Sequence, residues 1–120
     1  MISPFADIMR QAVESTPGAI GGAFADADGE TVDLFASDRE DWAILTAHYG
    51  IVLNFVKSAF NVFHYGDTQF MLLRHTEVDV MMQSVADGYY AIMAMHSPAP
   101  LGTAMSVLDR AVVQLRQEMG

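Results

Sequence analysis

The chain has 120 residues, no cysteine, six lysines and arginines, and a net charge of −9 at neutral pH. These values fit a single domain spanning 1–120, exclude disulfides and thiolate chemistry, and argue against binding to nucleic acid or an anionic membrane surface. The apolar fraction of 52% is high for so small a domain, which predicts an apolar interface with another protein.

The first predicted element is a helix that begins at Ser3-Pro4 and ends at Pro17-Gly18. Serine is a good N-cap, and proline suits the first helical position. The first four residues carry no basic charge, so we expect no signal peptide. No apolar run approaches the ~20 residues of a membrane span, so we expect no membrane insertion and a cytoplasmic location.

A hairpin follows, with strands over Ala19–Ala25 and Thr31–Phe35. The turn between them is Asp26-Ala27-Asp28-Gly29, whose residues are typical of tight turns. Gly21 and Gly22 lie inside the first strand. Because glycine there permits close approach, we expect a helix to pack closely on this strand.

A long helix is predicted from Ser37 to Gly66, roughly 40 Å between its ends. Ser37 and Glu40 fit a capping box, and Gly66 fits a left-handed stop. Apolar side chains cover an arc of roughly 200°: Trp42, Ile44, Leu45, Tyr49, Ile51, Val52, Leu53, Phe55, Val56, Phe60, Val62 and Phe63. The other arc is poor in charge: Ala43, Ala47, Gly50, Asn54, Ser58 and Asn61, with Thr46 and Lys57 at its edge. We expect one side to pack on a sheet and the other to meet a second chain; the alternative is a helix whose back faces water.

Three strands are predicted next, over 69–74, 78–85 and 89–95, followed by a helix from Leu101 to Met119. The segment 89–95 is apolar throughout, which favours a central strand covered on both faces. The strand methionines are expected to fill the core: Met71, Met81, Met82, Met93 and Met95. The order α-β-β-α-β-β-β-α predicts an α+β fold, an α/β/α sandwich around a five-stranded antiparallel sheet.

Few residues offer chemistry. The histidines show no metal-ligand spacing, and Asp26 and Asp28 lack the further oxygen ligands of a calcium loop. No phosphate-binding loop or activated serine motif is present. Arg39 could act as an arginine finger, although an exposed first-turn residue is the favoured interpretation. We therefore expect no enzyme activity, no cofactor and no metal.

Two segments together resemble the roadblock/LC7 domain family: Pro17–Ala23 running into Asp26–Gly29, and Tyr90–Ala94 followed by the helix start at Leu101-Gly102. The resemblance spans the chain. It implies helices 1 and 3 on one sheet face and the long helix on the other. It also implies a dimer, homomeric or formed with a paralogue, that binds a small Ras-like GTPase and regulates or localises it without being a GTPase itself.

In that family the long helices of two protomers lie side by side and the third strands pair. Carried over, the dimer interface comprises Ala47, Gly50, Ile51, Asn54, Ser58, Asn61, Phe70, Met71, Leu72 and Leu73. Contact with the GTPase is expected at Arg39, Trp42 and Lys57. Gly50→Arg is expected to split the dimer.

Two other functions remain open. One is an assembly module that bridges larger proteins without affecting nucleotide turnover. The other is a sensor that holds a small ligand between helix and sheet.

Overall fold

A computed structural model describes residues 3–120, and its elements follow in the predicted order. They are α1 (Pro4–Glu14), β1 (Ala19–Ala25), β2 (Thr31–Ala36), α2 (Arg39–Phe60), the short 3₁₀ helix η1 (Asn61–Phe63), β3 (Phe70–Arg74), β4 (Val78–Ser84), β5 (Tyr90–His96) and α3 (Leu101–Met119). The strand boundaries lie within one residue of those predicted.

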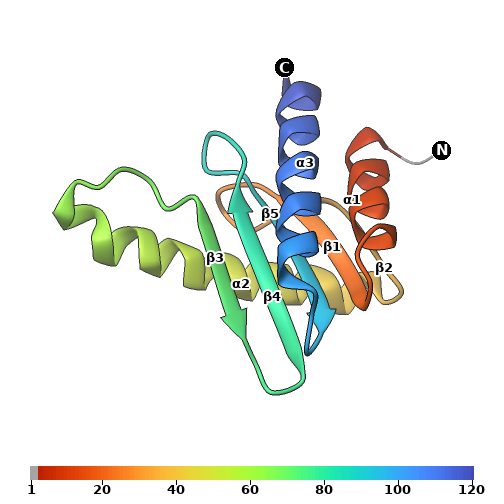
Figure 1. Cartoon of the computed structure of the whole chain (residues 1–120). Helices are drawn as coiled ribbons and strands as arrows, with labels where there is room; N and C mark the ends of the chain where they lie inside the picture. Colours follow the sequence, from red (N-terminus) through yellow and green to blue (C-terminus); the bar gives the residue numbers. More distant parts are fainter. Residues whose placement is uncertain (1–2) are drawn as a thin grey trace.

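The five strands form one antiparallel sheet in the order β2-β1-β5-β4-β3. Helices α1 and α3 cover one face, and α2 crosses the other (Figure 1). The α+β sandwich and the placement of its helices are therefore confirmed. β5 is the central strand, and all its residues except His96 are buried, as its continuous apolar sequence predicts.

The sheet separates two apolar cores. The core beneath α1 and α3 contains Met81, Met93 and Met95, and the core beneath α2 contains Met82. These four side chains are at most 1% exposed and fill the interior as predicted, whereas Met71 on the edge strand β3 is only half-buried.

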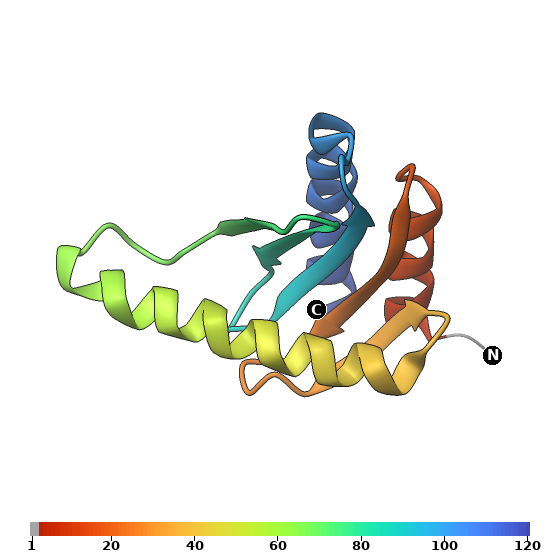
Figure 2. The same ribbon diagram turned by 90° about the horizontal axis from the view of Figure 1, so that it is seen from below.

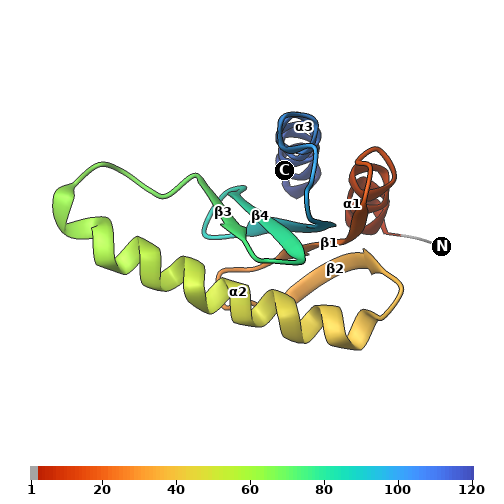
Figure 3. The ribbon, with the colours of Figure 1, turned by 60° about the horizontal axis from the view of Figure 1, so that its bottom comes forward.

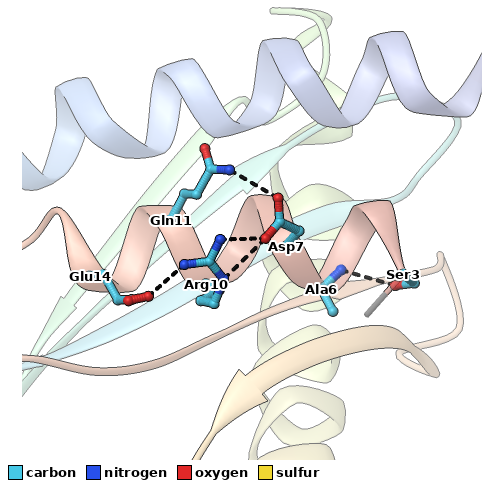
Figure 4. A network of polar contacts seen from close by, with 6 residues as sticks. All are labelled: Ser3, Ala6, Asp7, Arg10, Gln11 and Glu14. Atoms are coloured by element: carbon cyan, nitrogen blue, oxygen red, sulfur yellow. Dashed lines mark hydrogen bonds and ion pairs between the residues drawn. The ribbon is translucent and has the colours of Figure 1, made fainter. Parts of the chain in front are cut away.

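Helix α1 begins as predicted, because the Ser3 side chain accepts a hydrogen bond from the Ala6 amide. On its outer surface Arg10 pairs with Asp7 and Glu14 (Figure 4). Ion pairs this exposed add little to stability. The helix is held mainly by its buried face.

The two strand glycines have the predicted role. A Cβ on Gly21 would lie 2.5 Å from the Trp42 ring of α2, and one on Gly22 would lie 2.9 Å from Met9 of α1. A helix therefore packs closely on each face of β1. At Gly21 the Trp42 ring leaves no room for a side chain, and at Gly22 the flexible end of Met9 would have to move.

Helix α2 begins and ends differently from the prediction. Its N-cap is Asp38, whose carboxylate accepts from the Asp41 amide, so the Ser37 capping box does not form. The α-helix ends at Phe60, η1 adds one tighter turn, and His64 takes the left-handed stop with φ 57°. Gly66 also has a positive φ, 94°, but lies beyond that stop.

The face that α2 turns to the sheet is narrower than its apolar arc. Its buried residues are Trp42, Thr46, Gly50 and Leu53. Gly50 lies over β5, where an added Cβ would be 2.3 Å from the Tyr90 hydroxyl oxygen. That hydroxyl donates to the Thr46 carbonyl at 2.8 Å. The small-residue side of α2 was expected to face a second chain. At Gly50 this expectation is wrong, because Gly50 packs on Tyr90 of its own chain.

Tyr90 couples this contact to pH. Burial, with a smaller effect of the Asp26 charge, raises the pKa of Tyr90 to about 12 from an ordinary 10.0. The unfolded chain ionises first as pH rises, so the stabilisation by neutral Tyr90 is complete below about pH 10 and is lost between about pH 10 and 12.

We expect Tyr90→Phe to cost about 1 kcal/mol at neutral pH through its lost hydrogen bond. Urea unfolding from neutral to alkaline pH should show a smaller alkaline loss for the variant. Equal losses in both proteins would contradict this assignment.

Candidate functional site

The outward face of α2 is apolar and exposed. Ile44, Ile51 and Phe55 lie opposite the sheet-facing residues, and Phe55 is 71% exposed. His48 lies among them, with Nδ1 2.8 Å from the Ile44 carbonyl oxygen. Since single exposed apolar residues are common but contiguous stripes are not, this face has the character of an interaction surface.

The second half of α2 projects past the β3 edge of the sheet, as Figures 2 and 3 both show. This overhang ends in an exposed aromatic group formed by Phe60, Phe63 and Tyr65. The ring centroids of Phe60 and Phe63 are 6.1 Å apart, and those of Phe63 and Tyr65 are 5.5 Å apart. Phe60 and Phe63 are 55% and 53% exposed and Tyr65 is 84% exposed, so this end of the helix is largely open to solvent.

The strand that the overhang extends past is β3, an edge strand. It pairs with β4 in unbroken register, and its other edge has no strand neighbour among residues 3–120. Its four apolar residues, Phe70–Leu73, are all half-buried. An unpaired edge presents main-chain donors and acceptors that a second strand can use.

The predicted interface residues divide between two surroundings. Gly50 is covered by Tyr90, and Ala47 lies against Gly29 of the β1–β2 turn. Asn54 reaches the same turn, with its amide nitrogen 3.4 Å from the Ala27 carbonyl. Ala47 is half-buried beside this turn and also lines an open surface hollow with Ala43 and Ile44, so it stays a predicted interface residue.

The remaining interface residues are accessible. Ile51, Asn54 and Ser58 line a shallow groove on α2 together with Phe55, and Asn61 is exposed in η1. With the strand residues Phe70–Leu73 they stay a predicted interface. The sequence reasoning placed Ile44 and Phe55 on the sheet-packing side and missed their role in the exposed face.

Of the predicted GTPase contacts, Trp42 is wrong, because only 8% of it is exposed and its ring packs on Gly21. Arg39 is exposed but held by its own chain: Nη1 donates to the Leu34 carbonyl at 2.9 Å and Nη2 lies 3.0 Å from Asp33. Lys57 is largely covered and pairs with Asp67 at 3.4 Å. None of the three offers a free charge on the outward face of α2.

The N-terminal end of the site is acidic. Asp38, Glu40 and Asp41 are exposed at the start of α2. Asp28 and Glu30 are also exposed, in the β1–β2 turn, which lies beside the middle of the helix. Within residues 3–120, no three histidine or acidic side chains are placed to hold a metal ion. This end of the surface is electrostatically suited to a basic partner.

A second open groove lies on the other flank of α2, between Leu45 and Tyr49 and the β3–β4 turn. The Tyr49 hydroxyl and His75 Nε2 are 2.7 Å apart across it. Burial raises the pKa of Tyr49, so its hydroxyl keeps its proton at neutral pH. The pair links helix and hairpin, which sequence spacing alone did not reveal.

The helical stretch Arg39–Phe63 has the length and composition of a membrane span, with a mean hydropathy of 1.2 in its most apolar window. This corrects the expectation that no segment comes near one. Only 17% of that window is buried, and its buried residues pack on the sheet. The high hydropathy of this segment is thus explained by a helix that packs on the sheet with one face and has a second, outward apolar face.

No known family profile matches the chain, and no curated protein matches it. Solved structures do. A roadblock/LC7 domain from Streptomyces avermitilis superposes with a TM-score of 0.87 at 14% identity, covering 93% of this chain and 94% of that one. Myxococcus xanthus MglB gives 0.88 at 9% identity, covering 98% and 96%. MglC from the same organism gives 0.69 at 21% identity, covering 97% and 99%. The chain therefore has the roadblock/LC7 fold.

Proposed function

We propose that two copies of this chain form a dimer through the outer surface of α2 and the β3 edge. The dimer is a non-enzymatic platform that binds a small Ras-like GTPase and regulates or localises it in the cytoplasm. The observation that carries the proposal is the overhang: an apolar helix end extends beyond an open strand, with no sheet of its own beneath it.

A second copy satisfies both features at once. Pairing of two β3 strands continues the sheet beyond its edge, and the continued sheet lies beneath the overhanging aromatic residues. Dimer formation also buries apolar side chains, and each Å² of apolar surface removed from water stabilises the dimer by about 25 cal/mol. A paralogue with the same edge and helix serves equally well.

The partner assignment rests on the fold shared with roadblock/LC7 and MglB structures and on the sequence resemblance. Within the described part of the chain this surface has no free arginine, because Arg39 is bound to Asp33 and Leu34. Any effect on GTP hydrolysis would then come from ordering the switch loops of the GTPase. The acidic end of α2 favours a basic surface on that partner.

Binding to a panel of small Ras-like GTPases, each loaded with GDP or with a non-hydrolysable GTP analogue, tests the proposal. We expect at least one GTPase to bind with an affinity that depends on the nucleotide. Binding that is absent throughout, or indifferent to the nucleotide, would instead favour an assembly module.

A further inference from the structure

The sheet has a second edge, at β2, and this edge differs from that at β3. β2 pairs with β1 on one side only. Two apolar side chains of β2 are exposed: Val32 is 42% accessible and Phe35 is 36% accessible. Left open, such an edge would invite pairing with another copy.

The outer main-chain groups at the middle of β2 are already occupied. The Leu34 amide donates to Asp33 Oδ1 at 2.8 Å, and the Leu34 carbonyl accepts from Arg39 Nη1 at 2.9 Å. In an antiparallel strand both main-chain groups of a residue point to the same side. Side chains bond both the amide and the carbonyl of Leu34, so these two main-chain groups point away from β1.

These side chains are also tied to one another. Arg39 Nη2 lies 3.0 Å from Asp33 Oδ1, and the Ser3 hydroxyl donates to the other oxygen of Asp33. Burial raises the pKa of Asp33, but the hydrogen bonds from Ser3 and Arg39 outweigh it and leave the pKa below its usual value. The carboxylate is thus charged at neutral pH and keeps its arginine.

A β-bulge adds to the protection. Phe24 pairs with Asp33 and Ala25 pairs with Thr31, so Val32 is left out of the register. Bulges and charged side chains are recognised ways in which sheets keep an edge from pairing. Strand β3 has no bulge, since its register is unbroken, and among the described residues no side chain bonds the outer main-chain groups of Phe70–Leu73. Its one charged residue, Arg74 at the end of the strand, pairs with Asp79 of β4.

We propose that Arg39 and Asp33 form a clamp that closes the β2 edge to a second copy of this chain, so that sheet pairing is confined to β3. The clamp makes the assembly a closed dimer, because a chain with two open edges could extend from one copy to the next without end. This proposal rests on the proposed β3 dimer but not on a GTPase partner, so its test is independent of the binding panel.

Arg39→Gln tests the clamp, with Arg10→Gln as the matched control, since Arg10 is also a surface arginine held by its own chain, through Asp7 and Glu14. Sedimentation velocity at matched concentrations should show species larger than the parent for Arg39→Gln and none for Arg10→Gln. Circular dichroism checks folding. If Arg39→Gln loses helix, Arg39→Met, which keeps the aliphatic stem, replaces it.

A second substitution locates the new contact. Adding Val32→Lys to Arg39→Gln places a charge on the β2 edge and should restore the parent's size. The proposal is overturned if the folded Arg39 variant keeps the parent's size. It is equally overturned if the larger species persist in the double variant, because their contact would then lie elsewhere.

Discussion

Gly50→Ala is expected to lower the free energy of unfolding by about 1–3 kcal/mol, the usual range for overpacking a core. At an open helical position the same change would add roughly 0.5–1 kcal/mol of stability, because glycine is a poor helix residue. The sign reverses here because the new methyl group would meet the Tyr90 hydroxyl at 2.3 Å and its ring carbon Cζ at 3.0 Å. α2 would have to move off β5, which would also break the Tyr90–Thr46 hydrogen bond.

Urea unfolding measures this effect, and Gly102→Ala is the matched control. Gly102 is also helical, in the first turn of α3, but nothing lies within 4 Å of its Cβ position. The Gly102→Ala variant should have the same free energy of unfolding as the parent, or a slightly higher one. Combining Gly50→Ala with Tyr90→Phe removes the closest atom, so the two changes should cost less together than their sum. A Gly50→Ala variant as stable as the control would show that α2 is not docked on Tyr90 as described.

Phe55→Glu is expected to convert the dimer into single chains and to abolish nucleotide-dependent GTPase binding. Phe55 is 71% exposed in the single chain, so the change should leave the fold intact. In the proposed dimer it would bury a carboxylate without a partner in an apolar seam, which costs several kcal/mol. A loss of about 4 kcal/mol corresponds to roughly a thousandfold weaker association.

The control is Val113→Glu, which places the same charge on an exposed apolar position of α3, 49% accessible and on the opposite face of the sheet. Sedimentation equilibrium should give single chains for Phe55→Glu and dimers for Val113→Glu. Circular dichroism should show both to be folded. If both variants form dimers, the outward face of α2 is not part of the dimer interface.

The order and type of all eight helices and strands that the sequence predicts agree with the structure. Local signals were sufficient because they act within a few residues, such as Ser3-Pro4 at the start of α1. The left-handed pair Asp87 and Gly88 gives the β4–β5 turn in the same way. Gly21 and Gly22 indicated a close approach, and only the structure identifies Trp42 and Met9 as the side chains that make it.

The orientation of α2 could not be predicted from its own sequence. An apolar arc of roughly 200° is wider than one sheet can cover, so periodicity does not decide which part is buried. The choice depends on Tyr90, about forty residues away along the chain. Its ring and hydroxyl require a helix position without a side chain, which only Gly50 supplies.

The role of Arg39 was hidden for a similar reason. An arginine in the first turn of a helix is ordinarily exposed, and this one is. Its contacts exist because the connection from β2 to α2 is only two residues long, which brings the start of α2 beside the outer edge of β2. A carbonyl group left open at a strand edge has no signature in sequence.

The molar mass of the unmodified chain in solution tests the central claim most directly. Sedimentation equilibrium over a wide range of concentrations is predicted to give twice the mass of one chain, with hydrogen exchange slowed at the β3 amides when the dimer forms. A single-chain mass at every concentration, with those amides exchanging freely, would contradict the proposed platform.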